Sequence, residues 1–393
     1  MLRLWMTLIG LLTALPGLTA SQKDTTAVDL VDLVIGRKKF RQANQIRADR
    51  KVYFSLFPAP VSTPGGGRAV ITAVNAAFHL GHPQTTNLSN VYFIPYTDLA
   101  TRFGIYVKPT IWLSENKWNF VGDYRLASFP QYTWGLGGNT QEFERTLIDT
   151  DFLRVYQNAL KRIGDAWFAG VGYALDYHYN IEEREVTMET GHLERYSVAL
   201  ADPSVSSGLT MNVAYDRRIN VINSPGGSYF MATWRVNQKA LGSDQDYQTL
   251  YLDARKYIPF SAKRVNLLAL RGYYWTVLTG EVPYLHLPST NWPPAFGTAS
   301  RGIQSGRYRS NGMVYGEAEH RYQLTPDGLV GVVVFMNFSS VSEFETHQFK
   351  YWIVGAGTGV RLKLNKYSGA NLAIDFGFSE NFWSVWLNVG EMF

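Results

Sequence analysis

The chain has 393 residues, of which 46% are hydrophobic and 15% aromatic, and it contains no cysteine. Without cysteine it can form neither a disulfide framework nor a lipid anchor on cysteine. The formal net charge is +5, or +4 once Arg3 is removed with the segment described next, which is too mild to indicate a nucleic-acid partner.

The first twenty residues have the pattern of a secretory signal peptide. Arg3 supplies the charged start, residues 8–15 the apolar core, and Leu18-Thr19-Ala20 a cleavage site before Ser21. A buried N-terminal helix is the alternative interpretation. Beyond residue 20, no apolar run approaches the about 18 residues that a membrane-spanning helix requires.

We interpret residues 21–51 as a short periplasmic leader. Apolar residues between Val28 and Val34 precede a basic run from Arg37 to Arg41, which predicts a small amphipathic helix with a basic end. This helix would either touch lipid headgroups or belong to a mobile or loosely docked periplasmic segment. The leader is too short to hold a further folded domain of ordinary size.

From Val52 onward, apolar residues recur at every second position. Phe103, Ile105 and Val107 begin one apolar face, and the same alternation returns over residues 166–178 and 351–364. Alternation over ten or more residues exceeds the usual strand of about five or six residues and fits a tilted strand that crosses a bilayer. The abundant aromatic residues and glycines also fit a barrel with lipid outside and a polar lumen. A soluble β-sandwich, the alternative, should have shorter strands.

About sixteen segments show this pattern, and fourteen is the nearest competing count because three of them alternate weakly. The predicted strands cover residues 68–80, 88–98, 101–113, 117–129, 151–163, 165–178, 194–202, 207–218, 228–238, 247–258, 264–276, 311–323, 328–340, 349–364, 370–379 and 382–393. We therefore predict an all-β fold, a 16-stranded antiparallel transmembrane β-barrel over residues 52–393. It would lie in the bacterial outer membrane, with both ends of the barrel sequence in the periplasm.

A long turn-rich interval from Leu278 to Ser310 separates two of the predicted strands. Loops of this length are usually functional or disordered. The interval ends in a stretch from Ser300 to Arg309 that carries three arginines and two glycines. We predict that this extracellular loop folds inward and plugs the lumen.

The last predicted strand ends at Phe393, with Trp383, Val385, Leu387 and Val389 in one apolar stripe. A strand that runs to a terminal phenylalanine resembles the signal by which outer-membrane assembly machinery recognises its clients. This interpretation agrees with the signal peptide predicted at the other end of the chain.

The turn-rich interval contains Arg301-Gly302, followed by Gly306-Arg307-Tyr308-Arg309. With these motifs, residues 52–393 resemble the barrel domain of the BamA/TamA superfamily, the bacterial surface antigen type, and in particular its short members that lack POTRA domains. In that family the sixth extracellular loop enters the barrel and carries an Arg-Gly-aromatic motif, often extended to Gly-Arg-Tyr-Arg. Both parts match here, with Ile303 in place of the aromatic residue. The loop also lies between the eleventh and twelfth predicted strands, where a sixth outer loop must lie. Further segments that resemble signatures of the short members are Pro130-Gln131-Tyr132, Gly135-Leu136-Gly137 and Gly280 to Pro288.

The resemblance implies that Arg301 points into the lumen and pairs with acidic residues of the next two strands. Glu319 matches the first acidic position, whereas Asn337 stands where an aspartate is usual and would offer a neutral hydrogen-bond acceptor. The alternative is that Arg301 and Glu319 are unrelated charges in a wet lumen. Other charges that face the predicted lumen are expected to form a solvated network, namely Asp123, Arg125, Asp253, Arg255, Arg361, Lys363 and Asp375.

Three consecutive glycines, Gly65, Gly66 and Gly67, stand before the first predicted strand. They resemble the weakly paired edge that serves as a lateral gate in this family, and a flexible entry turn is the equal alternative. Glycine raises the entropy cost of ordering a strand. The seam between residues 68–80 and 382–393 is therefore predicted to be the least stable strand pairing.

The sequence carries no pattern for a catalytic site or a cofactor, and His79 and His82 have no third ligand nearby that would indicate a metal site. Two classes of function remain. The resemblance implies a barrel that acts in outer-membrane protein assembly, transport or lipid organisation, and the alternative is a passive pore or a structural subunit of a larger outer-membrane complex. The predicted partners are outer-membrane lipid and other outer-membrane or periplasmic proteins. Oligomeric state does not follow from the sequence.

Overall fold

A computed structural model describes residues 27–35, 51–63, 67–98, 102–186, 201–261, 265–291, 300–380 and 382–393. The predicted signal peptide, residues 1–20, and the basic run from Arg37 to Arg41 lie outside these ranges. Within them, no helix has the length and apolarity needed to cross a membrane.

In the part of the chain that the structure describes, sixteen long strands and one short strand follow one another. They are β1 (Val52–Thr63), β2 (Gly67–Phe78), β3 (Ser89–Thr97), β4 (Phe103–Trp112), β5 (Trp118–Ser128), β6 (Gln131–Thr133), β7 (Thr146–Arg162), β8 (Trp167–Val186), β9 (Ser204–Asp216), β10 (Gly227–Asn237), β11 (Tyr247–Pro259), β12 (Asn266–Thr279), β13 (Gly312–Gln323), β14 (Val330–Val341), β15 (Ile353–Asn365), β16 (Ala370–Phe378) and β17 (Trp383–Val389). The helical segments are α2 (Leu30–Ile35) and the single turns η1 (Ser114–Asn116), η2 (Glu142–Glu144), η3 (Lys239–Leu241) and η4 (Tyr284–His286).

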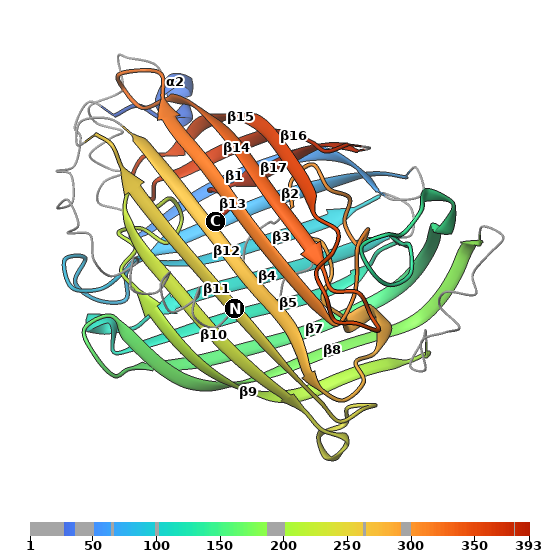
Figure 1. Ribbon diagram of the computed structural model, residues 1–393. Coiled ribbons are helices and arrows are strands. Elements are labelled where there is room, and N and C mark those ends of the chain that lie inside the picture. Colours follow the sequence, from blue (N-terminus) through green and yellow to red (C-terminus); the bar gives the residue numbers. More distant parts are fainter. Residues whose placement is uncertain are drawn as a thin grey trace.

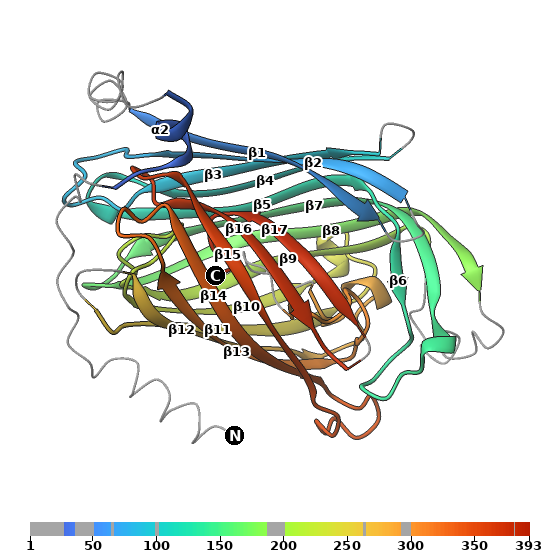
Figure 2. The same ribbon diagram turned by 90° about the horizontal axis from the view of Figure 1, so that it is seen from above.

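Each long strand pairs antiparallel with the next long strand, and the short β6 adds a pairing to β7. The strands form a tilted ring around a lumen (Figure 1 and Figure 2). Among the described residues, β1 is in register with β2 alone and β17 with β16 alone, so the ring is nearly closed and has an unsealed seam between β1 and β17. The prediction of an all-β, 16-stranded antiparallel barrel is confirmed.

Alternation along the strands separates an apolar outer surface from a polar lumen. On β14, Val334, Met336 and Phe338 are exposed on the outside, whereas Phe335 and Asn337 between them are buried. This is the pattern that a barrel requires when lipid covers one face of each strand and polar groups line the other.

The two ends of the barrel carry different connections. The turn end holds the start of β1, the end of β17 and α2, and the loop end holds the connection between β12 and β13. That connection is the sixth at the loop end, in agreement with the sequence analysis. At the turn end, the Lys366 ammonium lies 2.9 Å from Oδ2 of Asp32 and 3.1 Å from the carbonyl oxygen of Ala27, so α2 contacts the turn between β15 and β16.

All but one of the sixteen predicted strands coincide with a strand of the structure. The sequence pattern misses β1, because Pro58 and Pro60 interrupt it and proline is found in strands mainly at sheet edges. β1 is such an edge. The predicted strand at residues 194–202 lies outside the described residues except for its last two, which are not in a strand. These two differences offset each other, so the total of sixteen stands.

The last strand is shorter than predicted. β17 ends at Val389, and Gly390 has a φ of +104°, a left-handed conformation that turns the chain away from the strand direction. Met392 and Phe393 are buried, and the ring centre of Phe393 lies 6.3 Å from that of Tyr257. The expectation of a strand running to Phe393 is therefore wrong, because Gly390 directs the last residues into the barrel.

Candidate functional site

The connection between β12 and β13, residues 280–311, folds into the barrel, and we call it the inner loop. Its first part contains η4 and buries Val282 and Tyr284 against Tyr247 of β11. In its second part, Arg301 and Arg309 are no more than 1% exposed. Residues 292–299 lie outside the described chain.

The Arg301 guanidinium is the centre of the contact between the inner loop and the barrel wall. Its Nη1 lies 2.5 Å from Oδ2 of Asp375 on β16. Its Nη2 lies 2.5 Å from Oε2 of Glu319 and also donates to Oε1 of Glu317, both on β13. The guanidinium carbon lies 3.6 Å from the centre of the Phe335 ring, which adds a cation–π contact.

These surroundings keep Arg301 charged and fixed in direction. Burial would lower the pKa of Arg301, but Glu317, Glu319 and Asp375 together raise it well above its usual range. Charge-assisted hydrogen bonds from a planar guanidinium also set its orientation. Arg301 therefore holds the inner loop to β13 and β16 at the same time.

The backbone at the loop tip lies directly against the wall. The Asn337 amide donates to the carbonyl oxygen of Arg301 (2.9 Å), and the Gly302 N–H donates to the hydroxyl oxygen of Ser384 on β17 (3.1 Å). Gly302 has a φ of +86°, and a Cβ there would lie 2.6 Å from the backbone nitrogen of Phe378. Glycine alone combines this conformation with so close an approach.

Part of this arrangement is visible in the sequence. The contact between Arg301 and Glu319 is present, and Asn337 is within hydrogen-bonding distance of the loop. Asn337, however, donates to a backbone carbonyl, whereas the sequence suggested an acceptor. Glu317 and Asp375 supply the further carboxylates. Glu317 alternates with Glu319 on one face of β13, a signal visible in the sequence, but only the closed barrel brings Asp375 of β16 to the same place.

Arg361 extends these ionic contacts toward the C-terminal residues. From β15, its Nη1 lies 2.5 Å from Oδ1 of Asp375 and its Nε lies 2.7 Å from Oε2 of Glu391. Asp375 thus accepts from Arg301 at Oδ2 and from Arg361 at both of its oxygens. The expected solvated network is wrong for this pair, since Asp375 is 0% and Arg361 5% exposed, and burial leaves each charge dependent on its partner.

Arg321 provides a second route to the same residues. Its Nε lies 2.6 Å from Oε1 of Glu319, and its Nη2 donates to the backbone oxygen of Phe393 (3.2 Å). Burial would raise the pKa of Glu391, but Arg361 and Arg321 hold it below its usual range. The inner loop and the residues after β17 are therefore joined by buried charges. We call these seven residues the lumen ion network: Arg301, Glu317, Glu319, Arg321, Arg361, Asp375 and Glu391.

Arg307 and Arg309 join the inner loop to the connection between β5 and β7. Arg307 Nη2 donates to the carbonyl oxygen of Thr140 (2.6 Å). The carbonyl oxygen of Arg309 accepts from the N–H of Gly137 (2.8 Å). The Arg309 guanidinium donates to the carbonyl oxygen of Tyr284 (2.8 Å). The segment at residues 130–137 thus contacts the inner loop, which itself contains the other segment named in the sequence analysis, residues 280–288.

Gly306 and Tyr308 make contacts within the loop and with the lumen wall. The Gly306 N–H donates to the carbonyl oxygen of Thr290 (2.9 Å). The Tyr308 N–H donates to the hydroxyl oxygen of the same threonine (3.4 Å), and Tyr308 packs against the buried cluster that contains Tyr273 and Tyr315. These contacts fold the two halves of the inner loop against each other.

Gly65, Gly66 and Gly67 do not stand before the first strand, because β1 precedes them. Gly67 begins β2 and pairs with Thr63 at the end of β1, and Gly65 and Gly66 lie outside the described residues. Gly67 therefore belongs to the second strand of the barrel, and all three glycines follow β1 in the sequence. The open seam lies between β1 and β17, and not between the predicted segments 68–80 and 382–393.

Comparisons with known proteins bear on the identity of the chain. A model of the Omp85 superfamily domain matches residues 104–381, more than half of the chain. Among solved structures, BamA from Haemophilus ducreyi lacking POTRA domains 1-3 is similar at 13% identity and a TM-score of 0.50, with 86% of this chain and 69% of that chain covered. CdiB from Acinetobacter baumannii is similar at 12% identity and a TM-score of 0.52, with 86% and 60% covered. A search of curated proteins finds no match.

The family model and the solved structures agree at the level of the fold. At 12–13% identity the solved structures establish a shared barrel architecture. Among the described residues, no group of three or more His, Cys, Asp or Glu side chains is placed to hold a metal ion. The chain belongs to the Omp85 superfamily, whose barrels lie in the bacterial outer membrane and act there in transport and assembly and not as enzymes.

Proposed function

We propose that this barrel serves outer-membrane protein assembly, transport or lipid organisation, and that it works by opening between β1 and β17. The observation that carries the proposal is the seam. In the described chain neither strand is in register with the other, so each presents an edge whose backbone donors and acceptors are available to a third strand or to lipid headgroups.

Both seam strands have features that weaken their pairing. Pro58 and Pro60 stand two positions apart on β1, so the N–H groups that they lack would lie on one side of the strand. Because both prolines keep their register with β2, we infer that this is the seam side. On the other side of the seam, β17 is shorter, with 7 residues compared with 12 in β1, and the chain turns inward at Gly390. The seam therefore offers fewer hydrogen bonds than a full pairing such as β1–β2.

The inner loop supports one side of the seam from within the lumen. Arg301 reaches β16 through Asp375, and Gly302 reaches β17 through Ser384. We infer that these contacts keep β16 and β17 in place while β1 and β2 move away during opening. The inner loop would then be a fixed support of the opening and not the moving part.

A passive pore, or a structural subunit of a larger complex, is the alternative function. The observation that favours it is a chamber in the lumen that carries several charged side chains and is bounded on one side by the inner loop. A pore would conduct through this lumen with the seam closed. Tethering the seam therefore separates the two functions.

The natural chain has no cysteine, so an introduced pair can be cross-linked without interference. Ser55→Cys on β1 with Asn388→Cys on β17, joined by a thiol-reactive cross-linker, would tether the seam. Ser339→Cys with Ile353→Cys, at paired positions of β14 and β15, is the matched control. The proposal predicts that the seam tether abolishes acceleration of barrel-protein insertion into liposomes while the control tether does not. Full activity in the seam-tethered protein would refute it, and unchanged channel conductance together with no insertion activity in any form would support the pore.

We further propose the division of the chain into a signal peptide (1–20), a periplasmic leader (21–51) and the barrel (52–393). The contacts of Asp32 and Ala27 with Lys366 support a docked leader. Phe393 would act as an assembly signal before the barrel folds and become buried afterwards. Outer-membrane or periplasmic proteins are the proposed partners.

A further inference from the structure

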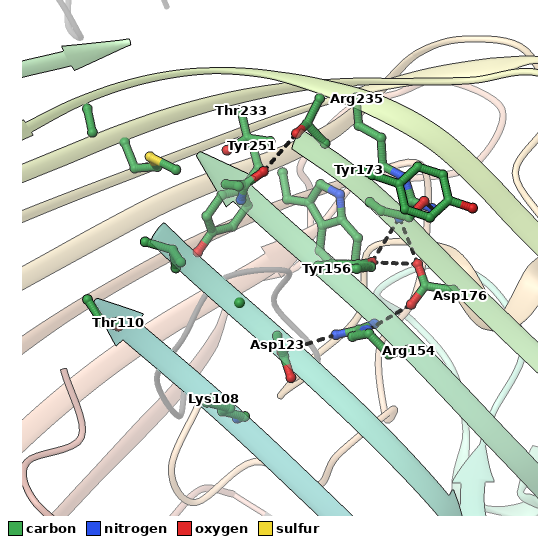
Figure 3. Close-up of a pocket in the computed structure, with 18 of the residues that line it drawn as sticks. Lys108, Thr110, Asp123, Arg154, Tyr156, Tyr173, Asp176, Thr233, Arg235 and Tyr251 are labelled. Carbon is green, nitrogen blue, oxygen red and sulfur yellow. Dashed lines mark hydrogen bonds and ion pairs between the residues drawn. The ribbon is translucent and has the colours of Figure 1, made fainter. Parts of the chain in front are cut away.

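A chamber of about 140 Å³ lies in the part of the lumen enclosed by β3 to β5 and β7 to β11 (Figure 3). Leu285, His286 and Leu287 of the inner loop line it on one side, and residues such as Asn90 and Asn119 line it toward the turn end. We propose that this chamber binds a small solute that carries a carboxylate or phosphate group. The proposal goes beyond the opening of the seam, because the chamber exists in the closed barrel.

The charge of the chamber favours an anion. Five cationic side chains line it, namely Lys108, Arg154, Arg218, Arg235 and Arg255. Three carboxylates line it as well, those of Asp123, Asp176 and Asp216, which leaves an excess of two positive charges. Including their ion-pair partners Arg125, Asp253 and Arg271, which do not themselves line the chamber, raises the excess to three. An enclosed cationic surface concentrates anions from solution.

Arg154 is the side chain best placed to bind the anionic group. Its Nε donates to Oδ1 of Asp176 (2.8 Å), but its Nη1 has no hydrogen-bond partner within the described chain and lies 3.9 Å from Oδ2 of Asp123. The side chain is 8% exposed and lines the chamber. A buried donor without a partner is unfavourable. A water molecule would satisfy that donor, but only an anion would also reduce the excess of positive charge.

The partners of Arg154 are already engaged, so its free donor is available to a ligand. Asp176 also accepts from Arg235 Nη1 (2.7 Å) and from the Tyr156 hydroxyl (2.5 Å), as Figure 3 shows. Asp123 is held by Arg125, at 2.5 Å between Oδ2 and Nη2. Two carboxylates committed to other cations leave Arg154 able to bind one more oxygen, and a guanidinium suits the oxygens of carboxylate and phosphate.

The other residues that line the chamber determine which further chemical groups the solute carries. Asn119 is 7% exposed, and its Oδ1 has no hydrogen-bond partner in the described part of the chain. It offers an acceptor for a hydroxyl or amide N–H group. Phe152, Phe168 and Trp275 supply apolar surface. We infer a small organic anion with at least one neutral donor, and not a bare inorganic ion, as the best-fitting class of ligand.

Calorimetric titration of the folded, detergent-solubilised full chain tests this proposal at low ionic strength. The probes are inorganic phosphate, citrate and, as a neutral control, glycerol. We expect saturable binding of at least one anion, weakened by salt, and no binding of glycerol. Binding of citrate that is tighter than that of phosphate would support an organic anion as the ligand, and binding of phosphate alone would overturn that assignment.

Arg154→Gln should weaken the binding about tenfold or more. Arg162→Gln is the matched control, since it also removes one positive charge but lies outside the chamber, at the end of β7. Asn119→Asp places a negative charge in the chamber without breaking an ion pair, so it should also weaken anion binding. This variant tests the proposal if Arg154→Gln does not fold. No saturable binding of either anion, or equal loss in the Arg162→Gln control, would overturn the proposal. Neither result depends on whether the seam opens.

Discussion

Removal of the Arg301 side chain should release the inner loop from the barrel wall. In Arg301→Ala, the buried carboxylates of Glu317, Glu319 and Asp375 lose the cation that they share. Breaking a buried ion pair by removing one partner costs about 3–5 kcal/mol. The equilibrium between the docked and the released form of the loop should therefore shift toward the released form by about a hundredfold to several thousandfold.

Limited trypsin digestion of the folded barrel measures this release, because the inner loop carries its own cleavage sites. Arg309 is 1% exposed in the docked loop and should resist cleavage, whereas Arg301→Ala should be cut there and after Arg307. Arg255→Ala is the matched control, since Arg255 forms a buried ion pair with Asp253 on β11. The control should lower the urea midpoint of unfolding and leave the loop protected. A loop that stays protected in Arg301→Ala, or that is cut equally in Arg255→Ala, would refute the reasoning.

Three further predictions concern the same loop. Asn337→Asp should destabilise the folded barrel by about 1–3 kcal/mol in urea unfolding, because it replaces the donor to the Arg301 carbonyl with a second acceptor; an unchanged midpoint would contradict the observed hydrogen bond. Gly302→Ala should destabilise the barrel more than Gly242→Ala, since both have a positive φ but a Cβ at Gly242 meets nothing within 4 Å; equal midpoints would show that the close approach is unimportant. Burial lowers the pKa of His286 from 6.5 to about 3, so the docked loop holds this histidine in its neutral form. Docking of the loop should therefore weaken as the pH falls below 6.5 toward 3, because the released loop then takes up a proton that the docked loop does not. Amide exchange of the loop at about pH 7.5 and about pH 5 checks this, and a pH effect that persists in His286→Gln would exclude His286 as its source.

Strand periodicity in the sequence predicted the barrel because one face of each strand must be apolar. The same criterion failed for β1, where Pro58 and Pro60 interrupt the pattern at an edge that tolerates them. It also failed at the end of β17, where the positive φ of Gly390 outweighs the apolar stripe that leads to Phe393. Both failures fall at the seam, where the chain does not follow the rules of an internal strand.

The site divides in a similar way between what is local and what depends on the closed barrel. Arg301 and Glu319 could be paired from the sequence because a family motif places them. The contribution of Asp375 could not be predicted, since it depends on the register of three successive strand pairings between β13 and β16. The reversed role of Asn337 follows from the position of the loop backbone, which side-chain patterns do not specify.

The proposed function requires the barrel to open at the seam between β1 and β17. Hydrogen–deuterium exchange of the barrel in lipid bilayers tests it most directly, because exchange reports the opening of individual strand pairings. The β14–β15 pairing, in register from Val330 with Leu362 to Ser339 with Ile353, serves as the internal reference. We predict that amides of β1 and β17 exchange faster than those of β14 and β15. Uniform protection around the whole ring would contradict the claim.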